Sequence, residues 1–278
     1  MLTATPARRL NSFDRAAIER VLERDPVASA AVADRVHSGF GWLADGALFG
    51  YGTHRQLEAL CWVGANLLPV NASSAAVAAF AETLPVRPPS CSSIVGPAAA
   101  TLPLWERLRE RWGPARDVRD TQPFLVADRP PAVAVDPSVR VVRPDEVDVL
   151  YPAAVAMYTE EVGICPVAEG GGQGYRRRVT DLVRGGRAYA RFVGGEVVFK
   201  AELAVVTRHT AQVQGVWVAP DWRGQGLGTA GMAAVVRDAL RRVAPTVSLY
   251  VNDYNEAARR VYARCGFRQT DTFATVLL

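Results

Sequence analysis

The chain has 278 residues, which is enough for one large domain or two of ordinary size. Its hydrophobic fraction of 49% and charged fraction of 22% are those of a soluble globular protein, and no apolar run is long enough to span a bilayer. The net charge of +4 does not indicate a nucleic-acid-binding protein, because the nearest basic stripe, residues 175–178, fits a solvated helix face or an acid-binding rim better.

The N-terminal part alternates apolar runs that predict strands with periodic runs that predict helices. The predicted strands are residues 47–51, 57–63, 65–70, 91–95 and 123–126, and the predicted helices are residues 73–84 and 102–112. A segment rich in proline, residues 127–138, interrupts the periodicity. We therefore predict two domains, residues 1–132 and 133–278, each of typical size.

The C-terminal part also predicts an α/β fold (an α+β mixed sheet). The predicted strands are residues 139–142, 187–193, 196–206, 209–218 and 247–251, followed by a last strand pair over residues 267–278. Helices are predicted over residues 145–161, 175–183 and 232–243, and a further helix begins at Asp253, which forms a capping box with Glu256. Residues 162–174 read as a loop, and Gly194-Gly195 predicts a hairpin turn.

The most informative segment of this part is residues 215–229, where a strand meets a proline turn, a glycine-rich loop and a helix start. Arg223 supplies a positive charge, and Gly224, Gly226 and Gly228 let the backbone approach a ligand closely. The N–H groups of the new helix point at that ligand. The alternating glycines do not match a dinucleotide fingerprint, so the segment predicts a cradle for another phosphorylated ligand.

A second motif lies in residues 249–267, where Asn255 and Tyr262 stand seven residues apart and nearly on one line of the predicted helix. Together the two motifs resemble the GNAT acetyltransferase superfamily. Its cofactor loop, Arg-x-x-Gly-x-Gly, is met by Arg223, Gly226 and Gly228. Its later helix motif is met at five positions: Asn255, Ala258, Tyr262, Gly266 and Phe267.

The resemblance covers residues 138–278, and the whole chain looks like an actinobacterial subgroup in which an uncharacterised domain precedes the GNAT domain. Residues 158–163 also fit that subgroup. The resemblance implies acetyl-CoA as co-substrate and direct transfer of its acetyl group to an amine. It implies that these residues bind acetyl-CoA: Val216, Trp217, Val218, Arg223, Gly224, Gln225, Gly226, Leu227, Gly228, Thr229, Asn255, Ala258 and Arg259.

In the mechanism that the resemblance implies, Tyr262 protonates the departing thiolate. The general base stays open between Glu160, Glu161, Glu202 and a chain of water molecules, with a slight preference for Glu161 because it leads into the predicted loop. Cys165 lies in that loop, but direct transfer needs no nucleophilic cysteine.

The N-terminal part repeats the element order of the GNAT half, which predicts tandem GNAT-like domains. If Gly113 matches Gly266, the tyrosine position falls on Arg109, and residues 69–74 replace the cofactor loop without any glycine or arginine. The N-terminal domain is therefore predicted to be a degenerate copy that no longer binds CoA and that shapes the acceptor site.

Scattered cysteines and histidines predict no metal site, and the first 14 residues lack the apolar stretch of a secretory signal, so we expect a cytoplasmic protein. We expect no nucleic-acid or membrane partner, and the sequence is compatible with a homodimer. Three functions remain open: an N-acetyltransferase for a primary amine, a tandem GNAT of mycothiol-synthase type acting on an amino-sugar thiol precursor, and a non-catalytic regulator that binds acyl-CoA.

Overall fold

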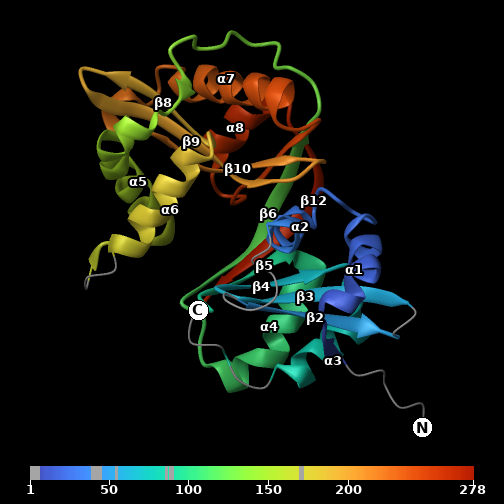
Figure 1. Ribbon diagram of the computed structural model, residues 1–278. Helices are drawn as coiled ribbons and strands as arrows, with labels where there is room; N and C mark the ends of the chain where they lie inside the picture. Colours follow the sequence, from blue (N-terminus) through green and yellow to red (C-terminus); the bar gives the residue numbers. More distant parts are fainter. Residues whose placement is uncertain (1–6, 39–45, 54–55, 85–86, 88–90, 169–171) are drawn as a thin grey trace. The chain divides into compact units, whose positions relative to one another are not determined.

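The computed structural model describes residues 7–38, 46–53, 56–84, 87, 91–168 and 172–278 (Figure 1). The chain forms two compact units that are not contiguous in sequence. Unit 1 comprises residues 1–124, 250–254 and 269–278, and unit 2 comprises residues 125–249 and 255–268. The division into domains at residue 132 stays a prediction.

Unit 1 contains a mixed sheet with the strand order β1-β2-β3-β4-β5-β12-β6. Its strands are β1 (Arg8–Arg9), β2 (Gly46–Gly52), β3 (Leu57–Gly64), β4 (Asn66–Val70), β5 (Ser93–Pro97), β6 (Asp117–Ala127) and β12 (Arg268–Leu277). Most neighbours are antiparallel, but β4 and β5 run parallel. The last strand therefore lies beside a strand from the first half of the chain, because β12 pairs with β5 from Phe273↔Pro97 to Leu277↔Ser93.

Helices cover both faces of this sheet (Figure 1). They are α1 (Arg15–Leu22), α2 (Ala30–His37), α3 (Ser74–Thr83) and α4 (Ala98–Trp112), with a 3₁₀ turn at Ser12–Asp14. Leu60 and Trp62 of β3 pack with α1 and α2, whereas Cys61 and Val63 pack with α3 and α4. This alternation is expected of a strand buried on both faces.

Unit 2 has the strand order β11-β10-β9-β8-β7. Its strands are β7 (Arg140–Val141), β8 (Ala188–Val193), β9 (Glu196–Val206), β10 (Ala211–Val218) and β11 (Val247–Tyr250). Helices α5 (Val147–Val162) and α6 (Gly172–Arg184) cover one face, and α7 (Leu227–Arg242) and α8 (Glu256–Arg264) cover the other (Figure 1). Short 3₁₀ turns at Pro144–Glu146 and Pro220–Trp222 precede α5 and the glycine loop.

Both units contain the same feature, a pair of adjacent parallel strands that separate after two residue pairs. In unit 1, β4 and β5 pair at Asn66↔Ser93 and Leu67↔Ile94. In unit 2, β10 and β11 pair at Ala211↔Val247 and Gln212↔Ser248, and β10 then runs on to Val218. Each pair of strands is followed by matching helices, and the tandem α/β architecture predicted from the sequence is confirmed.

Three local predictions were wrong. Residues 267–278 form one long strand, β12, instead of a strand pair. Helix α8 is capped by Asn255, whose side chain accepts from the Ala258 N–H at 3.1 Å, while the Asp253 carboxylate accepts from Tyr254 at 2.8 Å. Asn255 therefore lies outside the helix that holds Tyr262. Helix α6 begins at Gly172, inside the predicted loop, and Gly170 and Gly171 lie outside the described residues.

Candidate active site

The glycine loop lies between β10 and α7 and is shaped by two residues with positive φ. Gly224 has φ of 75°, and Gly226, which caps α7, has φ of 82°. A side chain at either position would be strained. Gly228 has an ordinary φ, and its space is limited by Val218 at 3.5 Å. A methyl group built on Gly224 or Gly226 would meet no described atom within 4 Å, so the loop faces open space.

The backbone N–H groups of residues 224–228 make no hydrogen bond to any residue that the structure describes. Five donors at the start of a helix of 16 residues, next to Arg223, can hold an anion. The loop therefore has donors placed to hold an anion, and its assignment to acetyl-CoA stays a prediction.

Arg223 is held by two acceptors within unit 2. Its Nε donates to the Val218 carbonyl at 2.9 Å, and its Nη2 donates to Glu160 at 2.7 Å. Glu160 also accepts from the indole N–H of Trp217 at 3.1 Å. The carboxylate of Glu160 is thereby paired with the cofactor loop, and its two oxygens are both in use.

Strand β10 bulges in its C-terminal half. The register with β9 shifts between Gln214 and Trp217, and Gly215 has φ of 56°. The buried Lys200 donates from Nζ to the Gly215 carbonyl at 2.8 Å, which fixes the bulge from the neighbouring strand. A Cβ at Gly215 would lie 2.9 Å from Lys200 Nζ. Both the positive φ and this close approach therefore favour glycine at this position.

Glu202 lies beside Lys200 on β9 and is only 5% exposed. Its carboxylate accepts from Lys200 at 3.3 Å and from Arg178 at 2.6 Å. Burial by itself would raise the pKa of Glu202, but the two cations outweigh burial and hold the pKa below its ordinary value. A carboxylate held in its charged form by two cations is a poor general base, so the predicted role of Glu202 is better described as structural.

Tyr262 projects from α8 and is 7% exposed. Its ring packs edge-on against Phe267 with centroids 5.8 Å apart. Its hydroxyl donates to none of the described residues. Burial, assisted by the charge of Glu161, raises the pKa of Tyr262 well above its ordinary value. The phenol therefore keeps its proton at neutral pH, as a general acid must.

Glu161 is the candidate base whose charge acts on Tyr262, and it also raises the pKa of Tyr175 together with burial and Glu202. It occupies the end of α5, which stops at Gly163 in the left-handed conformation. The charge of Glu161 thus acts on the phenol, whereas Glu160 pairs with Arg223 and Glu202 belongs to an ion-pair cluster. Ala258 lies in the first turn of α8 next to the exposed Arg259, and Val216 lies within the bulge of β10.

Sequence reasoning missed Lys200. A signal existed, because Lys200 is the only lysine of the chain and lies in the middle of a predicted strand that is mostly apolar. A buried cation needs a partner. The partners, Glu202 two residues along the strand and a carbonyl on the next strand, depend on register, which the sequence does not specify.

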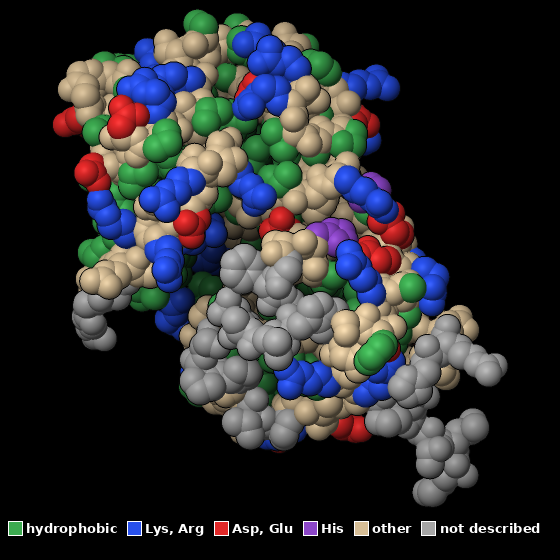
Figure 2. Space-filling view, in the orientation of Figure 1, with side chains coloured by type: hydrophobic (Ala, Val, Ile, Leu, Met, Phe, Trp, Pro, Cys, Tyr) green, Lys and Arg blue, Asp and Glu red, His purple; other side chains and the backbone are tan. Residues whose placement is uncertain are grey.

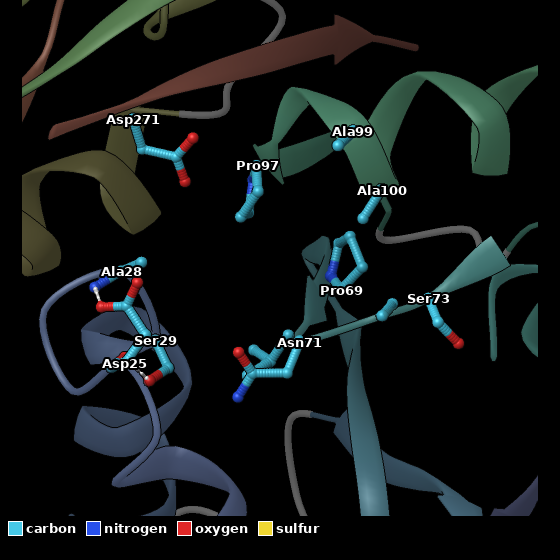
Figure 3. A pocket seen from close by; sticks show the side chains of 12 residues that line it. Asp25, Ala28, Ser29, Pro69, Asn71, Ser73, Pro97, Ala99, Ala100 and Asp271 are labelled. Carbon is cyan, nitrogen blue, oxygen red and sulfur yellow. Dashed lines mark hydrogen bonds between the residues drawn. The ribbon is translucent and has the colours of Figure 1, made fainter.

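The parted strands of unit 1 end in a different site (Figure 3). After β4 the chain passes through Asn71, with φ of 50°, to Ser73, which caps α3. A cavity of about 350 Å³ opens there, with the segment between α1 and α2 on one side and the ends of β4 and β5 on the other. Asp25 and Asp271 line it. Two carboxylates repel a pyrophosphate, so this cavity is unsuited to CoA.

Comparison with known proteins agrees with this geometry. Residues 149–267 match the Acetyltransferase (GNAT) family. This part of the chain is a GNAT domain. Residues 46–150, which precede and slightly overlap it, match a domain of unknown function, DUF4081.

Two solved structures extend the likeness over the whole chain. An acetyltransferase of the GNAT family from Colwellia psychrerythraea is 11% identical, with a TM-score of 0.61 over 98% of this chain and 99% of that chain. A tandem GNAT protein from the clavulanic acid biosynthesis pathway is 16% identical, with a TM-score of 0.55 over 97% of both chains. At such identities the likeness establishes the tandem GNAT fold alone.

One curated relative is closer in sequence over a short segment. The mycothiol acetyltransferase of Nocardiopsis dassonvillei is 44% identical over 61 residues, which are 22% of this chain and 18% of the relative. The match therefore spans less than a fifth of that protein's length. Within the described part of the chain, no group of metal-ligating side chains and no helix long and apolar enough to cross a membrane is found.

Proposed function

We propose that the protein transfers the acetyl group of acetyl-CoA directly to a primary amine. The observation that supports this most strongly is the open glycine loop of unit 2, whose N–H groups at residues 224–228 are free of described partners and follow a strand that parts from its neighbour. In this proposal pantetheine lies along β10 beyond Gln212, where β10 no longer pairs with β11, and the backbone groups of Val216 and Val218 bind it as an added strand would.

In the proposed reaction the amine nitrogen attacks the thioester carbon, the new C–N bond forms, and the C–S bond breaks. The backbone N–H of Trp217 or Val218, after the bulge, stabilises the oxyanion. The amine proton passes to Glu161 directly or through water, and Tyr262 gives its proton to the CoA thiolate. Unit 1 has a GNAT-like fold but lacks the glycine loop found in unit 2. We therefore infer that each chain binds one CoA.

The first test measures CoA thiol release by the full chain with acetyl-CoA and a panel of small amines and amino-terminal peptides. We expect turnover that requires both substrates. Binding of acetyl-CoA without turnover of any amine or peptide would favour a non-catalytic regulator and contradict the proposal.

A second measurement tests the cradle by calorimetric titration with CoA. Gly226→Val should weaken CoA binding by about 10-fold or more, because it strains the loop and blocks the approach of the pyrophosphate. Gly195→Val is the matched control, since Gly195 has a similar φ of 85° and equally open surroundings but lies in the β8–β9 hairpin. Equal weakening by both variants would contradict the assignment of the loop.

The match to a mycothiol acetyltransferase favours a second candidate function, acetylation of an amino-sugar thiol precursor. The two candidates differ only in the acceptor. Turnover of an amino-sugar thiol at a kcat/KM about 100-fold above that of simple amines would favour this acceptor, a ratio that one well-placed polar contact can supply. Equal turnover would favour the general amine acetyltransferase.

A further inference from the structure

A second cavity of unit 2 has a lining that the proposed transferase reaction does not use. It has a volume of about 550 Å³ and lies beside β7, β8 and the C-terminal half of α7. Four of its lining residues are arginines, and two more are polar: Arg140, Arg237, Arg241, Arg242, Asp238 and Tyr189. Figure 2 shows a group of basic side chains over α7.

Positive charge exceeds negative charge in this lining. Asp238 is its single carboxylate, and that carboxylate accepts from Arg241 at 3.0 Å, from Arg242 at 2.7 Å and from the Tyr189 hydroxyl at 2.9 Å. These contacts, chiefly the Arg242 bond, lower the pKa of Asp238 to about 2, so the carboxylate is charged and fully engaged. The lining thus contains four guanidinium groups and one carboxylate, which only Arg241 and Arg242 contact.

Two of the arginines keep donors for a ligand. Arg237 is exposed and makes no hydrogen bond or ion pair to any described residue. Arg241 is 74% exposed at its side chain and uses one nitrogen on Asp238. Both Nη atoms of Arg140 donate to Glu146, which does not line the cavity, so the charge of Arg140 is largely compensated there.

Helix electrostatics explains part of this cluster. Arg241 and Arg242 lie in the last turn of α7, where cations complement the partial negative charge of the helix end. Arg237 lies more than a turn before that end, and Arg140 belongs to a strand. Arg140 is placed by its ion pair with Glu146, so Arg237 is the lining arginine that neither the helix end nor a described partner accounts for.

The cavity is separate from the cofactor cradle. Leu227 begins α7 at the cradle, and Arg237 lies ten residues later, which is about 15 Å along the helix axis. The two sites share no lining residue.

We propose that this cavity binds a small phosphorylated molecule. Guanidinium groups present paired donors that match phosphate oxygens, and a surplus of positive charge favours a ligand with two or more negative charges. A cavity of about 550 Å³ has the size of a small-molecule site, whereas nucleic acid binds to an extended basic surface. This difference favours a phosphate ester or polyphosphate over nucleic acid as the ligand. The proposal does not depend on the acetyltransferase activity.

The test is a calorimetric titration of the full chain with sodium tripolyphosphate, in the presence of saturating CoA so that the glycine loop is occupied. We expect one further site, and at least about a 10-fold loss of affinity in the double variant Arg237→Ala/Arg241→Ala, since two charge-assisted contacts are removed. Both side chains are exposed, so the variant should unfold at the same temperature as the native chain.

The matched control is Arg177→Ala/Arg184→Ala, which removes the same charge from exposed positions of α6. This control should change the affinity for tripolyphosphate less than about 2-fold. Arg177 and Arg184 do not line the cavity, and exposed charges outside it are screened at physiological salt. The proposal is overturned if tripolyphosphate does not bind to the CoA-saturated chain or if both double variants weaken binding equally. Binding of a 20-nucleotide oligonucleotide but not of tripolyphosphate would equally overturn it.

Discussion

The chemistry of the candidate active site rests on one phenol, that of Tyr262. Phe267 fixes its ring, burial keeps its proton in place, and its hydroxyl is free of described partners. Replacing Tyr262 by phenylalanine removes the hydroxyl and leaves the ring contact. We expect kcat to fall by about 10²-fold, within the range of general acid catalysis, with KM for acetyl-CoA changed less than about 2-fold.

Steady-state kinetics with an acceptor identified from the amine panel would measure this effect. Tyr254→Phe is the control, because Tyr254 is 69% exposed and takes no part in the proposed reaction. A Tyr262→Phe variant with unchanged kcat, under conditions where chemistry limits the rate, would remove Tyr262 from the mechanism.

The buried contacts of Lys200 lead to a prediction about the stability of the fold. Its removal leaves the buried Glu202 with Arg178 as its remaining cation and frees the Gly215 carbonyl. We expect Lys200→Met to destabilise the fold by about 3 kcal/mol, as breaking a buried ion pair does. The double variant Lys200→Met/Glu202→Gln should recover a good part of this loss in urea unfolding. A single variant as stable as the native chain would show that Lys200 does not hold the bulge.

Individual site residues were predictable to different degrees. Gly226 and Tyr262 belong to motifs with fixed spacing, so the sequence alone marks them as candidates, and their roles stay predictions. The pairing of Glu160 with Arg223 joins residues 63 positions apart and depends on how α5 lies over β10. Asn255 was placed inside a helix because its spacing from Tyr262 fits helical periodicity, yet an asparagine at a helix start commonly caps it.

At the scale of elements, Glu146 ties β7 to the start of α5. Its carboxylate accepts from both Nη atoms of Arg140 at 2.7 Å and from the Arg143 N–H at 2.8 Å. These bonds, the Arg140 bond first, lower the pKa of Glu146 from 4.5 to about 2. A lowered pKa in the folded state stabilises the fold above the ordinary pKa, and this stabilisation is lost as the pH falls through the folded value.

We therefore expect Glu146→Gln to lose about 2 kcal/mol of unfolding free energy at pH 7, the magnitude of a hydrogen bond to a charged group. The difference from the native chain should shrink as the pH falls from 4.5 towards 2. Asp145→Asn is the control, because that side chain is 72% exposed and should lose less than about 0.5 kcal/mol. A difference independent of pH would contradict the electrostatic explanation.

The order of elements from β2 to β11 was largely readable from the sequence, because strands and helices differ in hydrophobic period. Helices α1 and α2 escaped prediction. Each has eight residues, which is too short for the period to be distinct, and they owe their stability to packing on β3 and β4.

At the scale of the whole molecule, the sequence did not predict which strands pair with one another. A periodic run indicates a strand but not its neighbour, so nothing in residues 268–277 shows that they pair with β5. Unit 1 nevertheless depends on them. Phe273, Ala274 and Val276 of β12 are each at most 4% exposed, and Val276 belongs to the core beneath α3 and α4.

Removing residues 269–278 should therefore unfold unit 1 locally. Burial of Phe273 and Val276 alone contributes about 4 kcal/mol, a large share of the 5–15 kcal/mol that typically stabilises a domain. We expect a chain ending at Arg268 to lose amide protection in β5, residues 93–97, while amides in β9, residues 196–206, stay protected. Hydrogen exchange read by mass spectrometry measures both strands in one experiment.

The full-length variant Val276→Asp should show the same selective loss, because it places a charge in the core of unit 1 without shortening the chain. Unchanged protection of β5 in both proteins would mean that unit 1 is stable without its last strand, and equal loss in β9 would mean that the two units unfold as one.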